Sequence, residues 1–330
     1  MAKIVLGLGT THSPMLNLTA EQWKHRAEID FANKKLHLAN GTRLTYPELL
    51  ELRGPVYRDQ INLDIMKEKE LACQAALDRL ADALERVNPD VVVIVGDDQA
   101  ELFSPDSQPA FAIFHGDDMA TTTGKYGKGA SDWMLQVGRG YMMEDVYHAP
   151  AAQSFSTSLI HSLIMQDVDV AAVASVPEPT KAGFGHAYGF ILKRLFRREI
   201  PVVPVLLNTY FPPNVPTANR CYDIGRRLRT AIEQHPSDLK VAIVASGGLS
   251  HFVVEEDFDY MIINALKARD EATLRAIPHS ALRSGTSETL NWILTAGAVD
   301  FMPVRSLDYY PLHRTEAGTG VGAAFCIWED

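Results

Sequence analysis

The chain is poor in cysteine, in basic residues and in long apolar runs. Its three cysteines lie far apart in 330 residues and form neither a disulfide framework nor a zinc-binding spacing. Lysine and arginine number 31 against 41 acidic residues, for a net charge of −10, which argues against nucleic-acid or anionic-membrane partners. No apolar run approaches the roughly 20 residues that span a bilayer, and no secretory leader pattern opens the sequence. We therefore expect a reduced, cytoplasmic protein without nucleic-acid or membrane partners.

Hydrophobic residues make up 46% of the chain, enough for a large buried core. Short β-branched runs alternate with segments in which apolar residues recur every three or four positions. The pattern predicts one α/β domain over residues 1–330, with a mixed central sheet flanked by helices. The expected strands are 3–9, 91–96, 110–114, 169–175, 201–207, 240–246 and 321–327, and the expected helices are 61–84, 151–165, 186–198, 217–234, 258–275 and 287–296.

Two segments depart from this alternation. Residues 19–57 follow the first strand with short helical patterns and delay the first long helix far beyond ordinary loop length. We expect them to be a helical insertion that caps a cleft or builds a subunit interface. Residues 116–147 are rich in Gly, Asp, Thr and Met without a clear period and predict a long surface loop.

Polar residues follow three of the predicted strands. His12 comes after the run 4–8, Asp97 to Gln99 after the run 91–96, and His251 after the run 241–246. Such strand ends share one edge of an open α/β sheet, where these folds place their chemistry. Glu288 adds a carboxylate near the start of a helix. A histidine, a second neutral ligand and a carboxylate, with positions left for substrate and O₂, are typical of non-haem Fe(II) oxygenases.

Several segments, in order along the chain, resemble the class III extradiol ring-cleavage dioxygenases, the family of the catalytic subunit of protocatechuate 4,5-dioxygenase. They are THSP at 11–14, VVVIVGDDQAELF at 91–103, the segments 109–113 and 208–213, DLKVAIVASGGLSH at 238–251 and GTSETLNWILTAG at 285–297. The resemblance implies the fold of that subunit, a catechol-like aromatic substrate, O₂ and Fe(II). By position, His12 and Glu288 resemble iron ligands, His251 the acid/base, and His186 a further active-site histidine. A homodimer is the default expectation for the assembly.

One position departs from the family. Where the family has Asp-His, with the histidine as second iron ligand, this chain has Asp98-Gln99. Three interpretations follow: Gln99 ligates the metal through Oε1, a histidine such as His37 or His115 replaces it, or metal binding is lost. Because a carbonyl oxygen is a harder donor than imidazole, the first interpretation also admits another divalent metal in place of iron.

Two functions from other classes stay open at this stage. The first is a metal-independent lyase, hydrolase or decarboxylase that acts on a related aromatic through His251 and His186 with Asp98. The second is a catalytically silent binding protein on the same fold. Each candidate residue also has a structural interpretation: His12 as a polar turn residue, Ser250 as a helix cap and Glu288 as an acidic residue in a first helical turn.

Overall fold

A mixed, nine-stranded sheet forms the centre of the molecule. The computed structural model describes residues 1–126 and 129–330. The strands run in the order β11-β13-β1-β10-β4-β9-β5-β8, with β12 paired to β13. They are β1 (Lys3–Thr10), β4 (Val91–Asp97), β5 (Phe111–Phe114), β8 (Ala171–Val173), β9 (Val202–Leu207), β10 (Lys240–Ser246), β11 (His251–Val253), β12 (Val304–His313) and β13 (Thr319–Trp328).

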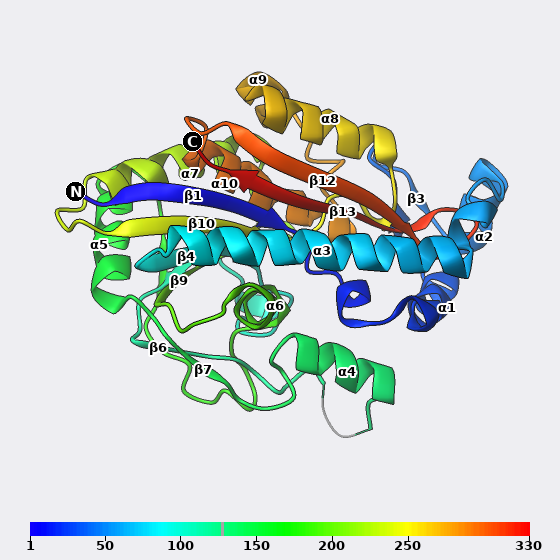
Figure 1. Cartoon of the computed structure of the whole chain (residues 1–330), viewed down its shortest axis with the longest axis horizontal. Helices are drawn as coiled ribbons and strands as arrows, with labels where there is room; N and C mark the ends of the chain where they lie inside the picture. The colour runs from blue at the N-terminus through cyan, green and yellow to red at the C-terminus, as the bar shows by residue number, and fades with distance from the viewer. Residues whose placement is uncertain (127–128) are drawn as a thin grey trace.

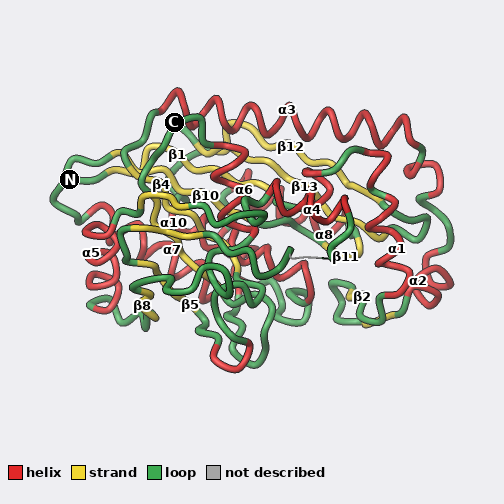
Figure 2. The backbone as a smooth tube through the Cα atoms, turned by 90° about the horizontal axis from the view of Figure 1, so that it is seen from below, coloured by secondary structure: helices red, strands yellow, loops and turns green. Residues whose placement is uncertain are grey.

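Helices cover both faces of this sheet. The long helix α3 lies on one face with α6, and α5, α7 and α10 pack on the other, so that Figure 2 shows α3 and α7 on opposite sides of the strands. The helices of these layers are α3 (Leu63–Val87), α4 (Asp132–Gly140), α5 (Gln153–Ile164), α6 (His186–Leu195), α7 (Ala218–Glu233), α8 (Glu256–Ala268), α9 (Glu271–Arg275) and α10 (Thr289–Ala298). The predicted α/β class, with a mixed sheet between helices, is confirmed.

The pleat of the sheet explains why its central strands are apolar without alternation. In β4, Val91, Val93 and Val95 enter the core beneath α7 and α10, whereas Val92 and Ile94 enter the core beneath α3. Both faces of the strand are therefore buried, as expected for parallel strands between helices. All the predicted strands and helices form within a few residues of their expected bounds, except that the helix expected at 258–275 is two helices, α8 and α9, separated at Arg269 and Asp270.

Residues 19–57 form a small, mostly helical unit after β1. It contains α1 (Lys24–Ala32), the two-residue strands β2 (Leu36–His37) and β3 (Arg43–Leu44), and α2 (Tyr46–Arg53). Leu36, Leu38 and Leu49 of this unit pack with Val253 of β11 and with Ala317 in a third, separate hydrophobic cluster. Figure 1 shows α1 and α2 beyond the carboxyl end of β1. The unit thus lies against the sheet edge where the candidate residues were expected.

The prediction of a long loop over residues 116–147 is wrong in part. This segment contains β6 (Asp118–Ala120), which pairs with β7 (His148–Pro150), and the helix α4. Met119, Val137, Tyr141 and Met143 are buried. The apolar residues that anchor the segment are too sparse to give a period, which is why the sequence pattern did not show them.

In the described residues, no helix is both long and apolar enough to cross a membrane.

Three parallel neighbours, β1, β10 and β4, place their carboxyl ends side by side. The register aligns Thr10 of β1 with Ser246 of β10, and β10 with β4 through Ala245 and Val95. The residues that follow these strands therefore emerge at one edge of the sheet, as the sequence pattern predicted for His12, Gln99 and His251.

Candidate active site

A partly open cavity of about 140 Å³ lies at this edge of the sheet. His12, Gln99, His186, His251 and Glu288, the site residues expected from the sequence, all line it. They come from the end of β1, the loop after β4, the start of α6, the start of β11 and the turn before α10. The prediction of one shared cleft is confirmed for His12, Gln99 and His251, whereas Asp98 does not line this cavity.

His12 presents its Nε2 atom to the interior of the site. Its Nδ1 lies 2.9 Å from Oγ of Ser246, and that hydroxyl donates to the carbonyl of Ala187 at 2.6 Å. The serine proton is therefore already used, so His12 donates from Nδ1 and turns Nε2 toward the carboxylates of the site. Burial would lower the pKa of His12, but the charges of Glu288 and Asp97 outweigh burial and raise it. This Nε2 is buried and has no hydrogen-bond partner among the described residues. A buried histidine whose Nδ1 is held by a hydrogen bond and whose Nε2 has no such partner is arranged like a metal ligand.

His186 is oriented in the same way by a carboxylate. Its Nδ1 lies 2.6 Å from Oε1 of Glu101, which also accepts from Nζ of Lys125 at 2.8 Å. Burial alone would raise the pKa of Glu101, but the charges of His186 and Lys125 outweigh it and hold that pKa far below its usual range. The ionised Glu101 fixes the proton of His186 on Nδ1, so that Nε2 carries a lone pair toward the site.

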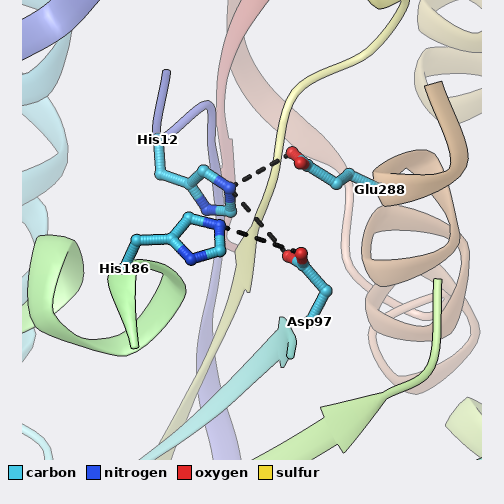
Figure 3. A group of neighbouring side chains, drawn as sticks. All are labelled: His12, Asp97, His186 and Glu288. Atoms are coloured by element: carbon cyan, nitrogen blue, oxygen red, sulfur yellow. Dashed lines mark ion pairs between the residues drawn. The ribbon is translucent and has the colours of Figure 1, made fainter. Parts of the chain in front are cut away.

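Two carboxylates face these imidazoles. Nε2 of His12 lies 3.2 Å from Oε2 of Glu288 and 3.9 Å from Oδ1 of Asp97, and Nε2 of His186 lies 3.8 Å from Oδ2 of Asp97. Figure 3 shows the two histidines on one side and the two carboxylates on the other, pointing toward a common centre. All four residues are buried, and their ligand atoms lie within 4.8 Å of one another.

The two carboxylates differ in electrostatic environment. Burial raises the pKa of Asp97 to about 6, and the negative charge of Glu288 adds to the rise. Burial would also raise the pKa of Glu288, but the attraction of His251 and His12 outweighs burial and holds the pKa well below its usual range. Glu288 is therefore the permanent anion of the cluster, and a cation bound here would also hold Asp97 in its ionised form.

Gln99 extends its amide into the cluster. Nε2 of Gln99 lies 3.2 Å from Oδ2 of Asp97, 3.3 Å from Oε1 of Glu288 and 3.1 Å from Nε2 of His186, and Oε1 lies 3.4 Å from Nζ of Lys125. The amide thus turns its hydrogen-bond donor inward and its carbonyl outward. An amide nitrogen is not a metal donor, so coordination by Gln99 requires its side-chain amide to turn over.

His251 contacts one carboxylate oxygen of Glu288, and His12 contacts the other. Its Nδ1 donates to the carbonyl of Leu249 at 2.9 Å, and its Nε2 lies 3.2 Å from Oε1 of Glu288. Tyr210 donates to the same Oε1 at 3.1 Å. His251 therefore presents Nε2 to Glu288, while its other nitrogen is held by the backbone.

Comparison with known families now identifies the chain. Residues 64–322 match the model of the catalytic LigB subunit of aromatic ring-opening dioxygenase. The chain belongs to this family. The match covers three of the four clustered residues, Asp97 at the end of β4, His186 at the start of α6, and Glu288, whereas His12 precedes it and is placed by the structure.

Two similar curated proteins are dioxygenases by name. The chain is 35% identical to gallate dioxygenase of Pseudomonas putida over 111 residues, which cover 30% of this chain and 32% of that protein. It is 28% identical over 211 residues to a 2,3-dihydroxyphenylpropionate/2,3-dihydroxicinnamic acid 1,2-dioxygenase of Mycobacterium ulcerans, covering 63% of this chain and 55% of that protein. The chain therefore spans from a third to just over half the length of these relatives.

The structure separates the candidates that the LigB resemblance had left open. Asp98 does not face the cluster, because its oxygens accept from the backbone N–H groups of Glu101, Leu102 and Phe103. His37 lines a different cavity, and His115 follows β5, so neither belongs to the cluster of the described residues. The histidine that does lie beside Gln99 is His186, whose Nε2 is 3.1 Å from Nε2 of Gln99.

Sequence reasoning placed Asp97 at the shared sheet edge but did not assign it as a possible metal ligand, and it missed two further residues of this LigB-type site. Asp97 is the last residue of a buried strand and faces the cluster. Glu101 and Tyr210 gave no signal, because their roles depend on contacts with residues 85 and 78 positions away in the chain. No spacing rule connects such positions.

Proposed function

We propose that this chain is an O₂-dependent dioxygenase that opens a single hydroxylated aromatic ring at a mononuclear metal, Fe(II) in the first instance. The observation that carries the proposal is the pair of buried imidazoles of His12 and His186. Each donates a hydrogen bond from Nδ1 to a residue outside the cluster and directs Nε2 toward the carboxylates of the cluster. Family membership supports the reaction class.

The donor set fits a divalent transition metal. His12, His186 and Glu288 form a two-histidine, one-carboxylate set, the combination typical of non-haem Fe(II) oxygenases, and Asp97 is a further donor beside them. The unpartnered Nε2 of His12 and the excess negative charge of the cluster both call for a cation. When bound, iron would supply the redox chemistry with O₂ that ring opening requires.

This assignment gives Gln99 and His186 roles other than those expected from the sequence. We propose that His186 ligates the metal in place of the family's Asp-His histidine, and that Gln99 donates hydrogen bonds to the carboxylates beside it. The carboxylate–histidine pair Glu101–His186 is the outer-shell arrangement that metal-binding histidines use. In the alternative, the Gln99 amide turns over and ligates through Oε1. Metal affinities of His186→Ala and Gln99→Ala distinguish the two arrangements.

The cavity binds and orients the substrate. Its volume of about 140 Å³ is close to the roughly 150 Å³ of an engineered cavity that accepts benzene, so it suits one aromatic ring with small polar substituents. Tyr210 and the peptide N–H of Gly248, at 3.0 Å, hold the carboxylate of Glu288 in place. These contacts keep the acid fixed while the ring enters.

His251 is the proton carrier in this proposal. With Nδ1 held by the Leu249 carbonyl, Nε2 is the atom that accepts a proton from a substrate hydroxyl and returns it later in the reaction. The nearby Glu288 carboxylate, 3.2 Å away, stabilises the imidazolium while it carries that proton.

Metal analysis and oxygen uptake test the proposal together. Protein purified without oxygen and reconstituted with Fe(II) should hold about one equivalent of iron, as a mononuclear site requires, and consume O₂ with a single-ring catechol. His251→Ala should keep the metal and lose most turnover, and a variant that turns over at the wild-type rate would remove His251 from this role. Absence of both metal and uptake would favour the metal-independent lyase, hydrolase or decarboxylase instead.

A further inference from the structure

A second pocket, larger than the active-site cavity, lies between the insertion of residues 19–57 and the rest of the domain. Its volume of about 650 Å³ is within the range of roughly 300–1,000 Å³ that ligand pockets have in other proteins. Its walls come from the β2–β3 hairpin of the insertion, from the loop after β9 and from residues 280–284. We call it the hairpin pocket.

The hairpin turns a basic face toward this pocket. His37 of β2 pairs with Arg43 of β3, and Lys35 lies two residues before His37. Residues directly opposite each other in an antiparallel pair share a face, as do residues two apart in one strand. All three line the hairpin pocket, whereas Leu36 of the other face is buried in the hydrophobic cluster of the insertion. The alternation that anchors the hairpin therefore also gathers its positive charge on the pocket side.

The positive charge of the hairpin pocket is not matched by acids. Arg283 adds a cation from the wall outside the insertion, and no acidic residue is among the described residues that line the pocket. Nε of Arg43 donates to the backbone carbonyl of Lys34 at 3.4 Å, and Nη2 of Arg283 lies 3.5 Å from Nδ1 of His279. Neither contact is with an acid. In a chain with a net charge of −10, this pocket is a local region of positive potential that attracts anions.

The electrostatic environment of His37 shows that these cations act on one place. Burial lowers the pKa of His37, and the charges of Arg43, Arg283 and Lys35 lower it further. Two of these cations belong to the hairpin, and the third lies some 240 positions further along the chain. The fold therefore brings positive charge from two separate chain segments to one pocket.

We propose that the hairpin pocket is a second ligand site, which binds a small organic dicarboxylate. A guanidinium presents paired N–H donors that match the two oxygens of a carboxylate. Arg43 and Arg283 belong to separate walls of the pocket, so a ligand with a carboxylate at each end matches both. The pocket has about 650 Å³, against about 140 Å³ for the active-site cavity, and therefore admits such an elongated anion.

The hairpin pocket adjoins the active-site cavity but is separate from it. Tyr210 is the one described residue that lines both. Its hydroxyl donates to Oε1 of Glu288 at 3.1 Å, on the side of the active-site cavity. A ligand of the hairpin pocket is therefore a second molecule beside the aromatic substrate. Its binding requires neither metal nor O₂, so the inference does not rest on the proposed function, and failure of either one leaves the other standing.

Calorimetric titration of the purified protein, without added metal, tests the inference. The probes are adipate, which has a carboxylate at each end, its neutral diamide adipamide, and inorganic phosphate. Arg283→Gln and Arg43→Gln change the hairpin pocket, and Lys125→Gln changes the active-site cavity. Lys24→Gln is the control, because Lys24 is exposed on α1 of the same insertion and lines neither site. Each variant removes one positive charge, so the four differ in where that charge lies.

We expect the wild type to bind one equivalent of adipate, and to bind adipamide at least about tenfold more weakly, as the loss of charge-assisted hydrogen bonds implies. Arg283→Gln and Arg43→Gln should each weaken adipate binding by about tenfold for the same reason. Lys24→Gln and Lys125→Gln should bind adipate within about threefold of the wild type, because distant, screened charges contribute little.

Four results would each overturn the inference. They are equal binding of adipate and adipamide, tighter binding of phosphate than of adipate, weaker adipate binding in Lys125→Gln but not in Arg283→Gln, and no saturable binding of adipate below about 10 mM. The comparison of adipate with adipamide uses the wild type alone, so it does not depend on the folding of any variant. Urea unfolding curves show whether a variant that loses binding has also lost its fold.

Discussion

Substitution of Glu101 gives the sharpest test of the metal centre, because Glu101 acts on the metal only through His186. Every neighbour of its carboxylate is a donor: Oε1 accepts from Nδ1 of His186 and Nζ of Lys125, and Oε2 accepts from the backbone N–H of Gln99 at 2.8 Å. A carboxamide in Glu101→Gln must therefore turn its NH₂ group against one of these donors. If it faces His186, it donates to Nδ1 and drives the proton to Nε2, where it blocks metal binding.

The magnitude follows from the contact that is lost. A hydrogen bond to a charged group contributes about 1.5–3 kcal/mol, which corresponds to roughly 10–150-fold in a binding constant. Substitution of the outer carboxylate of a metal-bound histidine costs about 10–100-fold in affinity in other proteins. The two estimates agree, so we expect Glu101→Gln to weaken metal binding by about 10–100-fold.

The assay is competition between the protein and a chromogenic chelator for Fe(II) under argon, with circular dichroism as a check of the fold. Glu233→Gln, at an exposed position near the end of α7, is the matched control and should bind metal as the wild type does. Affinity of folded Glu101→Gln within twofold of the wild type would refute the reasoning that Glu101 orients a metal-binding His186.

Three further predictions concern the same structure. His186→Ala should lower metal affinity by more than about 100-fold, whereas Gln99→Ala should keep an affinity within about threefold of the wild type, since imidazole is the better ligand for iron. Chelator competition measures both affinities, and the reverse order would assign the ligand role to Gln99. Gly285→Ala should lower turnover at least about tenfold with metal content unchanged, because a Cβ there would overlap the ring of His251 and overpacking displaces side chains; wild-type rates would exclude this effect. Burial lowers the pKa of His313 to about 3 from 6.5, so the unfolded chain takes up a proton that the folded chain does not, and stability falls as the pH drops from about 6.5 toward 3. At pH 5 the loss is about 2 kcal/mol, at 1.36 kcal/mol per pH unit. Urea unfolding at pH 7 and pH 5 measures the loss, and His313→Phe should remove most of it; an equal loss in that variant would contradict the assignment.

The sheet was predictable wherever burial dominates the sequence pattern. The run at 91–96 is β-branched and apolar because both faces of β4 are covered, and it formed a strand almost as expected. By contrast β12, at residues 304–313, was missed: it is half-buried along most of its length and contains Arg305, Asp308 and Pro311. It is tolerated as a strand because it pairs with β13 alone, and proline is acceptable on an edge strand.

The sequence pattern predicted several residues that line the candidate site, but it did not predict how their side chains are oriented and hydrogen-bonded. Placement after parallel strands sufficed to bring His12, Gln99 and His251 to one cavity, since strand ends share a sheet edge. It did not indicate that Asp97 rather than Asp98 faces the cluster. Adjacent side chains along an extended chain point to opposite sides, so only one of the two aspartates can face the cluster. Asp98 is the one that turns away, because the backbone N–H groups of Glu101 and Leu102 in the following loop donate to its carboxylate.

The orientation of the two imidazoles depends on one serine and one glutamate that no local pattern marks. Ser246, at the end of β10, accepts from His12 and donates to the carbonyl of Ala187, the residue after His186. One hydroxyl thus connects the histidine that follows β1 to the first turn of α6, while Glu101 fixes the other side of that turn. The metal-binding geometry is therefore a property of how β1, β10 and α6 pack, and a substitution such as Ser246→Ala should disturb both histidines although it touches the ring of only one.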